Sequence, residues 1–188
     1  MDYILNAAEA AEIDRISIYE MGIPSAVLME KAAMAVAHYI QEICSTSYSN
    51  MQPGRIKALA VCGMGNNGGD GIACARILKE AGFNASIFLA GDKNKATEET
   101  KRQLFIAGNL DVPFITKPED NEYNIIIDAL FGTGLSRNIE GEYAKLVDWI
   151  NRQPSEVIAV DIPSGINADN GQIYGCAVKA SHTVTFGS

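Results

Sequence analysis

Residues 63–71, of sequence GMGNNGGDG, constrain the fold of this chain more than any other segment. They follow an apolar run at 56–61 and precede a helical pattern at 72–81. Five glycines let the backbone approach a ligand closely, because glycine has no Cβ. The first three glycines satisfy G-x-G-x-x-G in the strand–turn–helix context of dinucleotide-binding folds. Such a turn presents free N–H groups and the positive end of a helix to an anion, typically a phosphate.

Length and composition indicate one globular domain covering residues 1–188. The chain is 47% hydrophobic and 20% charged, which are ordinary values for a soluble protein. Its net charge of −8 repels polyphosphate backbones, so we expect no nucleic-acid partner. No apolar run reaches the roughly 18 residues of a membrane span, and the acidic N-terminus does not resemble a signal peptide. We therefore predict a cytoplasmic protein without a membrane partner.

Strands and helices alternate from residue 56 onward. The pattern predicts strands at 56–61, 85–89, 112–115, 124–130, 156–160 and 183–186, and helices at 70–81, 98–107 and 142–151. Earlier in the chain, Asn6 and Glu9 form a capping-box pattern at the start of a helix over 6–20, and Ser25 is the candidate cap of a second helix. Thr97 is the candidate cap of the helix at 98–107. The alternation predicts a Rossmann-like three-layer α/β sandwich, with a mostly parallel sheet and an N-terminal helical extension.

Three polar, glycine-containing segments follow predicted strands, at 63–71, 128–138 and 161–165. Ligands of open α/β sheets bind outside the carboxyl ends of the strands. We therefore expect the three segments to converge on one crevice. Neither histidine of the chain lies in them, so no Ser-His-Asp arrangement is expected there.

The first segment carries groups that a plain dinucleotide fingerprint lacks. Asn66 and Asn67 add amide groups and Asp70 adds a carboxylate. The alternative is structural, since asparagine suits turns and Asp70 could cap the following helix. An ordinary NAD(P) oxidoreductase is less favoured, because it usually has an acid about 20 residues later at the end of the second strand. Here the second predicted strand, at 85–89, ends without an acidic residue, and the first acid after it is Asp92.

The second and third segments supply carboxylates at the ends of buried strands. Asp128 precedes a loop whose N–H groups, hydroxyls and Arg137 suit a phosphate; the alternative is a solvated loop. Asp161 ends another apolar strand, where desolvation raises a carboxyl pKa toward the range useful for acid–base catalysis; the alternative is a turn-forming Asp before Pro163. Asn67, Asp128 and Ser164 together offer only oxygen donors with at most one charge, which favours a monovalent hard cation.

Four motifs resemble the YjeF N-terminal-domain family: LMEKA at 28–32, GNNGGDG at 65–71, DALFGTG at 128–134 and DIPSG at 161–165. The resemblance runs in order over nearly the whole chain. The enzymes of this family are NAD(P)H-hydrate epimerases. The resemblance therefore implies an isomerase that interconverts the R and S forms of hydrated NADH and NADPH, a repair of damaged nicotinamide cofactor.

The resemblance also implies a set of site residues. It places the hydrate on Asn66, Asn67, Gly68, Gly69 and Asp70, on Gly132, Thr133, Gly134, Leu135, Ser136, Arg137 and Asn138, and on Asp161. It places a potassium ion on Asn67, Asp128 and Ser164, the oxygen set reached above. Our own hypothesis makes Asp161 the catalytic acid–base.

The resemblance further implies a homodimer, which would also cover the apolar first two helices. It implies a functional partner, an ADP- or ATP-dependent dehydratase, either separate or fused beyond residue 188, because relatives usually continue there. The competing hypothesis is a non-catalytic nucleotide- or protein-binding module of the same fold. Such modules often lose the polar site residues, whereas all three segments are complete here, which favours the enzyme.

Overall fold

The computed structural model describes residues 5–186 and contains one sheet of six strands in which every neighbouring pair is parallel. The strands are β1 (Lys57–Cys62), β2 (Asn84–Leu89), β3 (Phe114–Ile115), β4 (Ile125–Ala129), β5 (Glu156–Val160) and β6 (His182–Val184). Their order is β3-β2-β1-β4-β5-β6, so the winding direction reverses between β1 and β4. The predicted parallel sheet is confirmed, and the reversal marks where a ligand crevice is expected.

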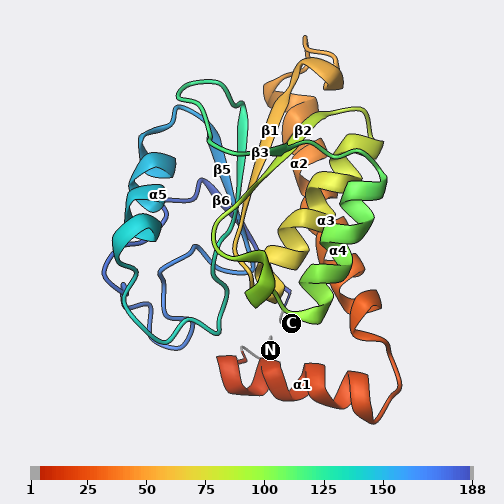
Figure 1. Ribbon diagram of the computed structural model, residues 1–188, viewed down its shortest axis with the longest axis vertical. Helices are drawn as coiled ribbons and strands as arrows, with labels where there is room; N and C mark the ends of the chain where they lie inside the picture. The colour runs from red at the N-terminus through yellow and green to blue at the C-terminus, as the bar shows by residue number, and fades with distance from the viewer. Residues whose placement is uncertain (1–4, 187–188) are drawn as a thin grey trace.

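Helices cover both faces of the sheet (Figure 1). They are α1 (Ala7–Tyr19), α2 (Ser25–Ser47), α3 (Asn66–Glu80), α4 (Glu98–Asn109) and α5 (Gly141–Arg152), with short 3₁₀ turns η1 (Pro53–Arg55) and η2 (Lys93–Lys95). Helices α2, α3 and α4 lie on one face and α5 lies on the other. The three-layer prediction is therefore confirmed. Among the described residues, no helix combines the length and the apolar character that a membrane span requires.

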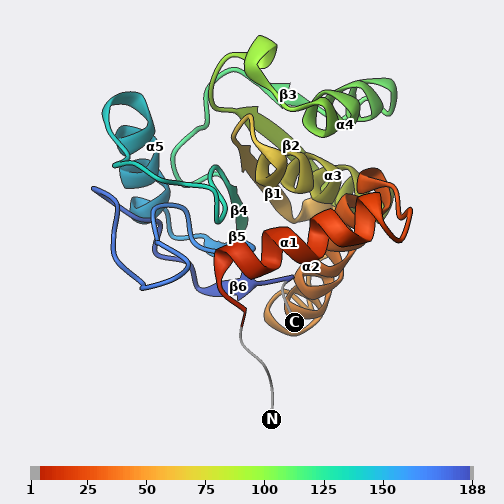
Figure 2. The same cartoon turned by 90° about the horizontal axis from the view of Figure 1, so that it is seen from below.

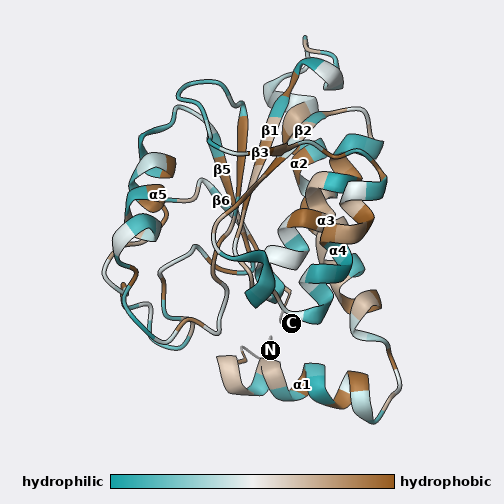
Figure 3. Ribbon diagram, in the orientation of Figure 1, coloured by the Kyte–Doolittle hydropathy of each residue, from teal (hydrophilic) through white to brown (hydrophobic). Residues whose placement is uncertain are grey.

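Alternate side chains of the strands feed two separate cores. Ala60 and Ile127 pack beneath α2 and α3, whereas Val61 and Ile126 pack toward α5. All four are fully buried. Because both faces of a parallel sheet are covered, its strands are apolar on both sides. The hydropathy colouring shows this as brown strands between helices with teal outer faces (Figure 3).

Helix α1 lies across the end of the sheet instead of joining a core (Figure 2). It begins with the predicted capping box: Asn6 Oδ1 accepts from the Glu9 N–H at 2.9 Å, and Glu9 Oε2 accepts from the Asn6 N–H at 2.9 Å. None of its residues is buried. The N–H of Ala7 donates to Asp169 Oδ1 at 2.8 Å, which ties the start of the helix to the loop after β5. Helix α1 therefore forms a cover over the strand ends.

The start of α3 differs from the prediction. The helix begins at Asn66, four residues before the expected start, so the glycine-rich turn is confined to residues 63–65. Glycine disfavours helices, but tertiary packing overrides this preference. A Cβ on Gly68 would lie 1.9 Å from the Gly63 carbonyl oxygen, and one on Gly71 would lie 2.4 Å from Ala129 Cβ. These glycines let the first turns of α3 pack directly against the strand ends.

The two other predicted caps have different outcomes. Thr97 caps α4 as expected, because its hydroxyl accepts from the Thr100 N–H at 3.3 Å. Ser25 does not cap α2: Pro24 occupies the N-cap position, and Ser25 Oγ instead donates to Glu99 Oε1 at 2.7 Å. This bond joins the first turns of α2 and α4.

Candidate active site

A pocket of about 790 Å³ lies between α1 and the carboxyl ends of the strands. All three polar segments reach it, as the sequence predicted. The predicted residues that line it are Asn66, Asn67, Asp70, Gly132, Thr133, Gly134, Leu135, Ser136, Arg137 and Asp161. The structure therefore brings together the amides, carboxylates, hydroxyls and guanidinium in one space.

Three residues predicted to contact a substrate lie outside this lining. Gly68 is pressed against the Gly63 backbone, and a Cβ on Gly69 would lie 2.7 Å from the methyl carbon of Met29. Both are buried inside the helix packing. Asn138 instead lies beside Gly175, whose Cβ would be 3.3 Å from its own. The geometry gives the two glycines a packing role and gives no support to a direct substrate contact for these three residues.

Asp161 turns its carboxylate into the pocket through an unusual backbone conformation. Its φ of +68° is in the left-handed region, which non-glycine residues seldom adopt. Its N–H still pairs with the Val184 carbonyl at 2.8 Å. The backbone N–H groups of Thr133 and Phe186 and the Thr185 hydroxyl act on the carboxylate to lower its pKa. Burial nevertheless dominates and raises the pKa of Asp161.

Asp70 is the second carboxylate of the pocket. It is the fifth residue of α3, so it does not cap that helix. Burial, followed by the negative charges of Asp161 and Asp14, raises the pKa of Asp70 to about 8. Asp70 therefore keeps its proton at neutral pH. Two neighbouring carboxyl groups whose pKa values are raised by burial are a common basis for acid–base chemistry.

Asp128 and Ser164 lie beneath the pocket and not in its lining. Asp128 is completely buried, and its Oδ1 accepts from Ser164 Oγ at 2.6 Å. Its Oδ2 accepts from the Ser164 N–H at 2.8 Å. Burial raises the pKa of Asp128 to about 6, although these hydrogen bonds favour the charged form. The pair links the end of β4 to the loop after β5.

Asn67 lines the pocket with a side-chain amide whose two polar atoms are unsatisfied. Both its side-chain oxygen and its nitrogen are buried without a hydrogen-bond partner. A Cβ on Gly132 would lie 3.2 Å from Asn67 Cβ, so the two residues are in close contact. Buried amides are rarely left unpaired in native proteins. An amide oxygen awaiting a partner, together with the Asp128 and Ser164 oxygens, suits a hard cation.

Sequence reasoning missed the residues that close the pocket from above and from the side. Helix α1 contributes Ala10, Ala11, Ile13 and Asp14, and the flanking loops and helices contribute Met64, Thr97, Tyr143 and Phe186. The sequence of α1 gave no sign of a ligand site. The position of α1 depends on contacts that no local pattern encodes.

Comparison with known proteins agrees with this geometry. Residues 25–188 match the family model described as YjeF-related protein N-terminus. The NAD(P)H-hydrate epimerase of Oenococcus oeni is 46% identical over 182 residues, covering 96% of this chain and 83% of that protein. The NAD(P)H-hydrate epimerase of Limosilactobacillus fermentum is 41% identical over 183 residues, covering 97% and 84%.

A solved structure shows the same architecture. The crystal structure of the yeast protein ynu0 superposes with a TM-score of 0.82 and 26% sequence identity, covering 98% of this chain and 80% of that one. The sequence match includes all three polar segments, and the structural match includes the sheet that positions them. This chain therefore belongs to the YjeF-related protein N-terminus family.

Proposed function

We propose that this protein is an NAD(P)H-hydrate epimerase, an isomerase that interconverts the R and S forms of hydrated NADH and NADPH. Relatives that are 37–46% identical over nearly the whole chain bear that name. The observation that carries the proposal is the pairing of Asp70 and Asp161, two carboxyl groups of raised pKa, in a pocket lined by a phosphate-type loop.

Epimerisation at the hydrated ring carbon requires that its C–O bond break and re-form on the other face. In our proposal the Asp161 carboxyl group donates a proton to the hydroxyl, which departs as water and leaves a cationic ring. The resulting carboxylate stabilises the positive charge. Water then adds from the opposite face and returns a proton to Asp161. Asp70, protonated at neutral pH, would donate a hydrogen bond without adding a second negative charge.

The remaining pocket groups suit the phosphates of such a substrate. The backbone of Gly132–Arg137 and the Arg137 guanidinium offer donors and positive charge within an otherwise acidic protein. Asn66, at the first position of α3, lies at the positive end of that helix. These groups would hold the dinucleotide while the ring faces Asp161.

We also propose that Asn67, Asp128 and Ser164 hold a potassium ion. The support is the unpaired, buried Asn67 amide, together with the fully buried oxygens of the Asp128–Ser164 pair. A bound monovalent cation would keep Asp128 ionised and would fix the first turn of α3. Among the described residues, no group of three or more His, Cys, Asp or Glu side chains is arranged to hold a metal ion.

A homodimer and a dehydratase partner also belong to this proposal. Val27 and Met34 on α2 are more than half exposed, which supports a surface that a second copy would cover. The cytoplasmic location stays a prediction. A non-catalytic module is the weaker alternative, because the polar residues of all three segments are present and converge on one pocket.

The direct test is to add the purified protein to a mixture enriched in one hydrate epimer, with potassium present. Proton NMR or chromatography would follow the two epimers over time. We expect equilibration far faster than in a protein-free control. Folded protein that leaves the rate at the spontaneous value would contradict the proposed function.

A further inference from the structure

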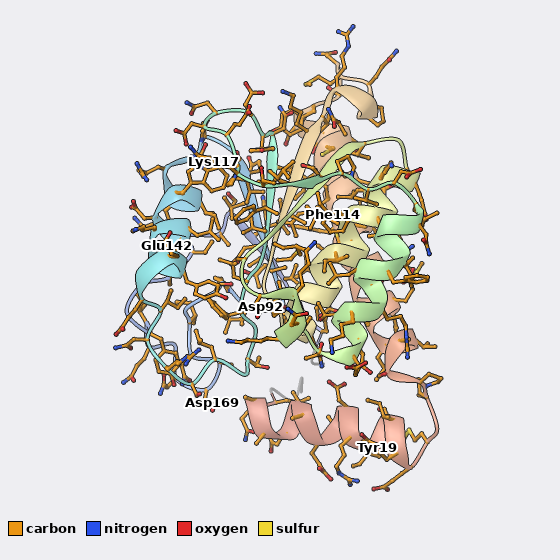
Figure 4. All side chains as sticks on the ribbon, viewed as in Figure 1. Tyr19, Asp92, Phe114, Lys117, Glu142 and Asp169 are labelled. Atoms are coloured by element: carbon orange, nitrogen blue, oxygen red, sulfur yellow. The ribbon has the colours of Figure 1, made fainter. Side chains whose placement is uncertain are left out.

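A second cavity of about 390 Å³ lies beside α5, where β2 ends and the chain continues from β3. Its walls are mainly aromatic and aliphatic side chains, among them Phe88, Leu146 and Trp149. Lys117, labelled in Figure 4, lines it from the segment after β3. We call this cavity the α5 groove. Apolar walls with a few charged groups are typical of small-molecule sites.

The α5 groove and the active-site pocket share the side chain of Tyr143 as part of their walls. Its hydroxyl donates to the Ala90 carbonyl at 3.2 Å. A Cβ on Gly91 would lie 2.7 Å from the Tyr143 hydroxyl and 3.1 Å from Met64, which lines the pocket. One extended ligand could therefore occupy both spaces by passing over this wall.

The sheet order indicates which part of a dinucleotide belongs in each space. Dinucleotides lie across the crevice where the strand order reverses, with one half on each side. Asp161 follows β5 on one side of the reversal between β1 and β4. The α5 groove lies at β2 and β3 on the other side. With the reacting ring at Asp161, the adenosine half falls in the groove.

The charges of the groove favour an extra phosphate. The Lys117 side chain is exposed and makes no ion pair within residues 5–186, whereas Lys145 is paired with Glu142 at 2.6 Å. A site for NAD usually has an acid after the second strand to bind the ribose 2′-hydroxyl. Here the first acid, Asp92, accepts two hydrogen bonds from Asn94 at 3.0 Å and caps η2.

We propose that the α5 groove binds the adenosine half of the hydrated dinucleotide, with the adenine against Trp149 and Phe88 and the 2′-phosphate on Lys117. NADPH hydrate is then the preferred substrate over NADH hydrate. This inference rests on the proposed function, and it names the substrate that the same site selects.

Binding to the groove can be followed by intrinsic fluorescence, because Trp149 is the only tryptophan of the chain. Titration with adenosine 2′,5′-bisphosphate should quench its fluorescence saturably, and adenosine 5′-monophosphate should need at least about tenfold higher concentration. An unchanged spectrum at saturating bisphosphate would overturn the assignment of the groove. Equal affinity for the two probes would overturn the role of Lys117.

Steady-state kinetics test the preference. For Lys117→Gln we expect KM for NADPH hydrate to rise about tenfold with kcat unchanged, and KM for NADH hydrate to stay within about twofold. Lys179→Gln, an exposed lysine outside both cavities, is the matched control and should match the wild type. If Lys117→Gln changes the KM for both substrates equally, or changes neither, the assignment of the 2′-phosphate to Lys117 is refuted. The proposed function would still stand in that case, provided that the wild type is active. An inactive wild type would instead refute the proposed function.

Discussion

Two hydrogen bonds join Ser164 to the fully buried carboxylate of Asp128: the hydroxyl reaches Oδ1 at 2.6 Å and the backbone N–H reaches Oδ2 at 2.8 Å. Ser164 Oγ also accepts from the Phe131 N–H at 2.9 Å. One hydroxyl therefore fixes the ends of two neighbouring strands and the start of the loop after β4. Its contribution to folding can be measured separately from any catalytic effect.

Ser164→Ala should lower the free energy of unfolding by about 2 kcal/mol, because it leaves the buried Asp128 carboxylate and the partly buried Phe131 N–H each short of a partner. Ser155→Ala is the control, since Ser155 Oγ donates to a neutral carbonyl, that of Tyr123, at 2.7 Å. The control should lose only about 1 kcal/mol in urea unfolding. Equal losses for the two variants would show that the bond to Asp128 has no special strength.

Asp161→Asn should reduce the epimerisation kcat by about 100-fold or more, as expected for loss of a general acid–base. Asparagine tolerates the left-handed φ of +68° and can accept from the same N–H groups, so the fold should be retained. Circular dichroism would check the fold, and epimer equilibration would give the rate. Asp14→Asn, on the α1 wall of the pocket, is the comparison. A full rate for Asp161→Asn would rule out the acid–base role.

Asp70 should make the protein less stable as pH rises. The folded state keeps the Asp70 proton up to about pH 8, whereas the unfolded chain releases it near pH 4. Between these values only the folded state holds the proton, so its stability falls with increasing pH. Asp70→Asn should therefore be more stable than the wild type at pH 8, by up to about 5 kcal/mol, and similar to it near pH 4.

Thermal unfolding across this pH range would measure that difference. Asp148→Asn is the control, because Asp148 is an exposed α5 acid paired with Arg152 at 3.1 Å. A constant difference between Asp70→Asn and the wild type from pH 4 to pH 8 would contradict the raised pKa of Asp70.

Potassium should stabilise the folded protein through Asn67. At a concentration tenfold above its dissociation constant, a ligand bound only to the folded state adds about 1.4 kcal/mol, or roughly 3–5 °C in Tm for a domain of this size. Thermal unfolding in potassium chloride and in choline chloride of equal ionic strength would reveal the difference. Asn67→Ala should abolish it, whereas Asn66→Ala, at the neighbouring exposed residue, should keep it. An unchanged potassium effect in Asn67→Ala would exclude this residue as a ligand.

Gly68→Ala should destabilise the fold by about 3 kcal/mol or more, because its Cβ would overlap the Gly63 carbonyl and backbone atoms cannot give way easily. Gly65→Ala is the control: no atom lies within 4 Å of a Cβ there, and φ is −81°. We expect that variant to lose no more than about 1 kcal/mol, the usual cost of a poorer N-cap residue. Similar losses in urea unfolding would show that packing does not explain Gly68.

Predictions from the sequence were most accurate where the evidence was local. The apolar runs located all six strands to within two residues at each end, and β5 matched at both. The Asn6–Glu9 capping box and the Thr97 cap also formed as predicted. These features depend on periodicity and on hydrogen bonds between residues three positions apart, which a sequence displays directly.

The start of α3 could not be predicted from the same kind of evidence. The sequence pattern places Gly68 and Gly69 in a turn before the predicted helix at 70–81, because glycine is a poor helix former. These two glycines and Gly71 are helical because each is packed against another segment: Gly68 against the Gly63 backbone, Gly69 against the Met29 side chain and Gly71 against Ala129 Cβ. Such contacts decide the conformation only after the sheet has formed.

The sequence by itself determined the parallel sheet and the three polar segments at its carboxyl edge, because alternation of buried strands and helices leaves few topologies. The tertiary structure decided the rest. It placed α1 with Asp14 over the pocket, left the Asn67 amide unpaired, raised the pKa of Asp70 to about 8, and set the α5 groove beside Tyr143. Each of these properties arises from burial and from charges brought together across long sequence separations, which no local pattern records.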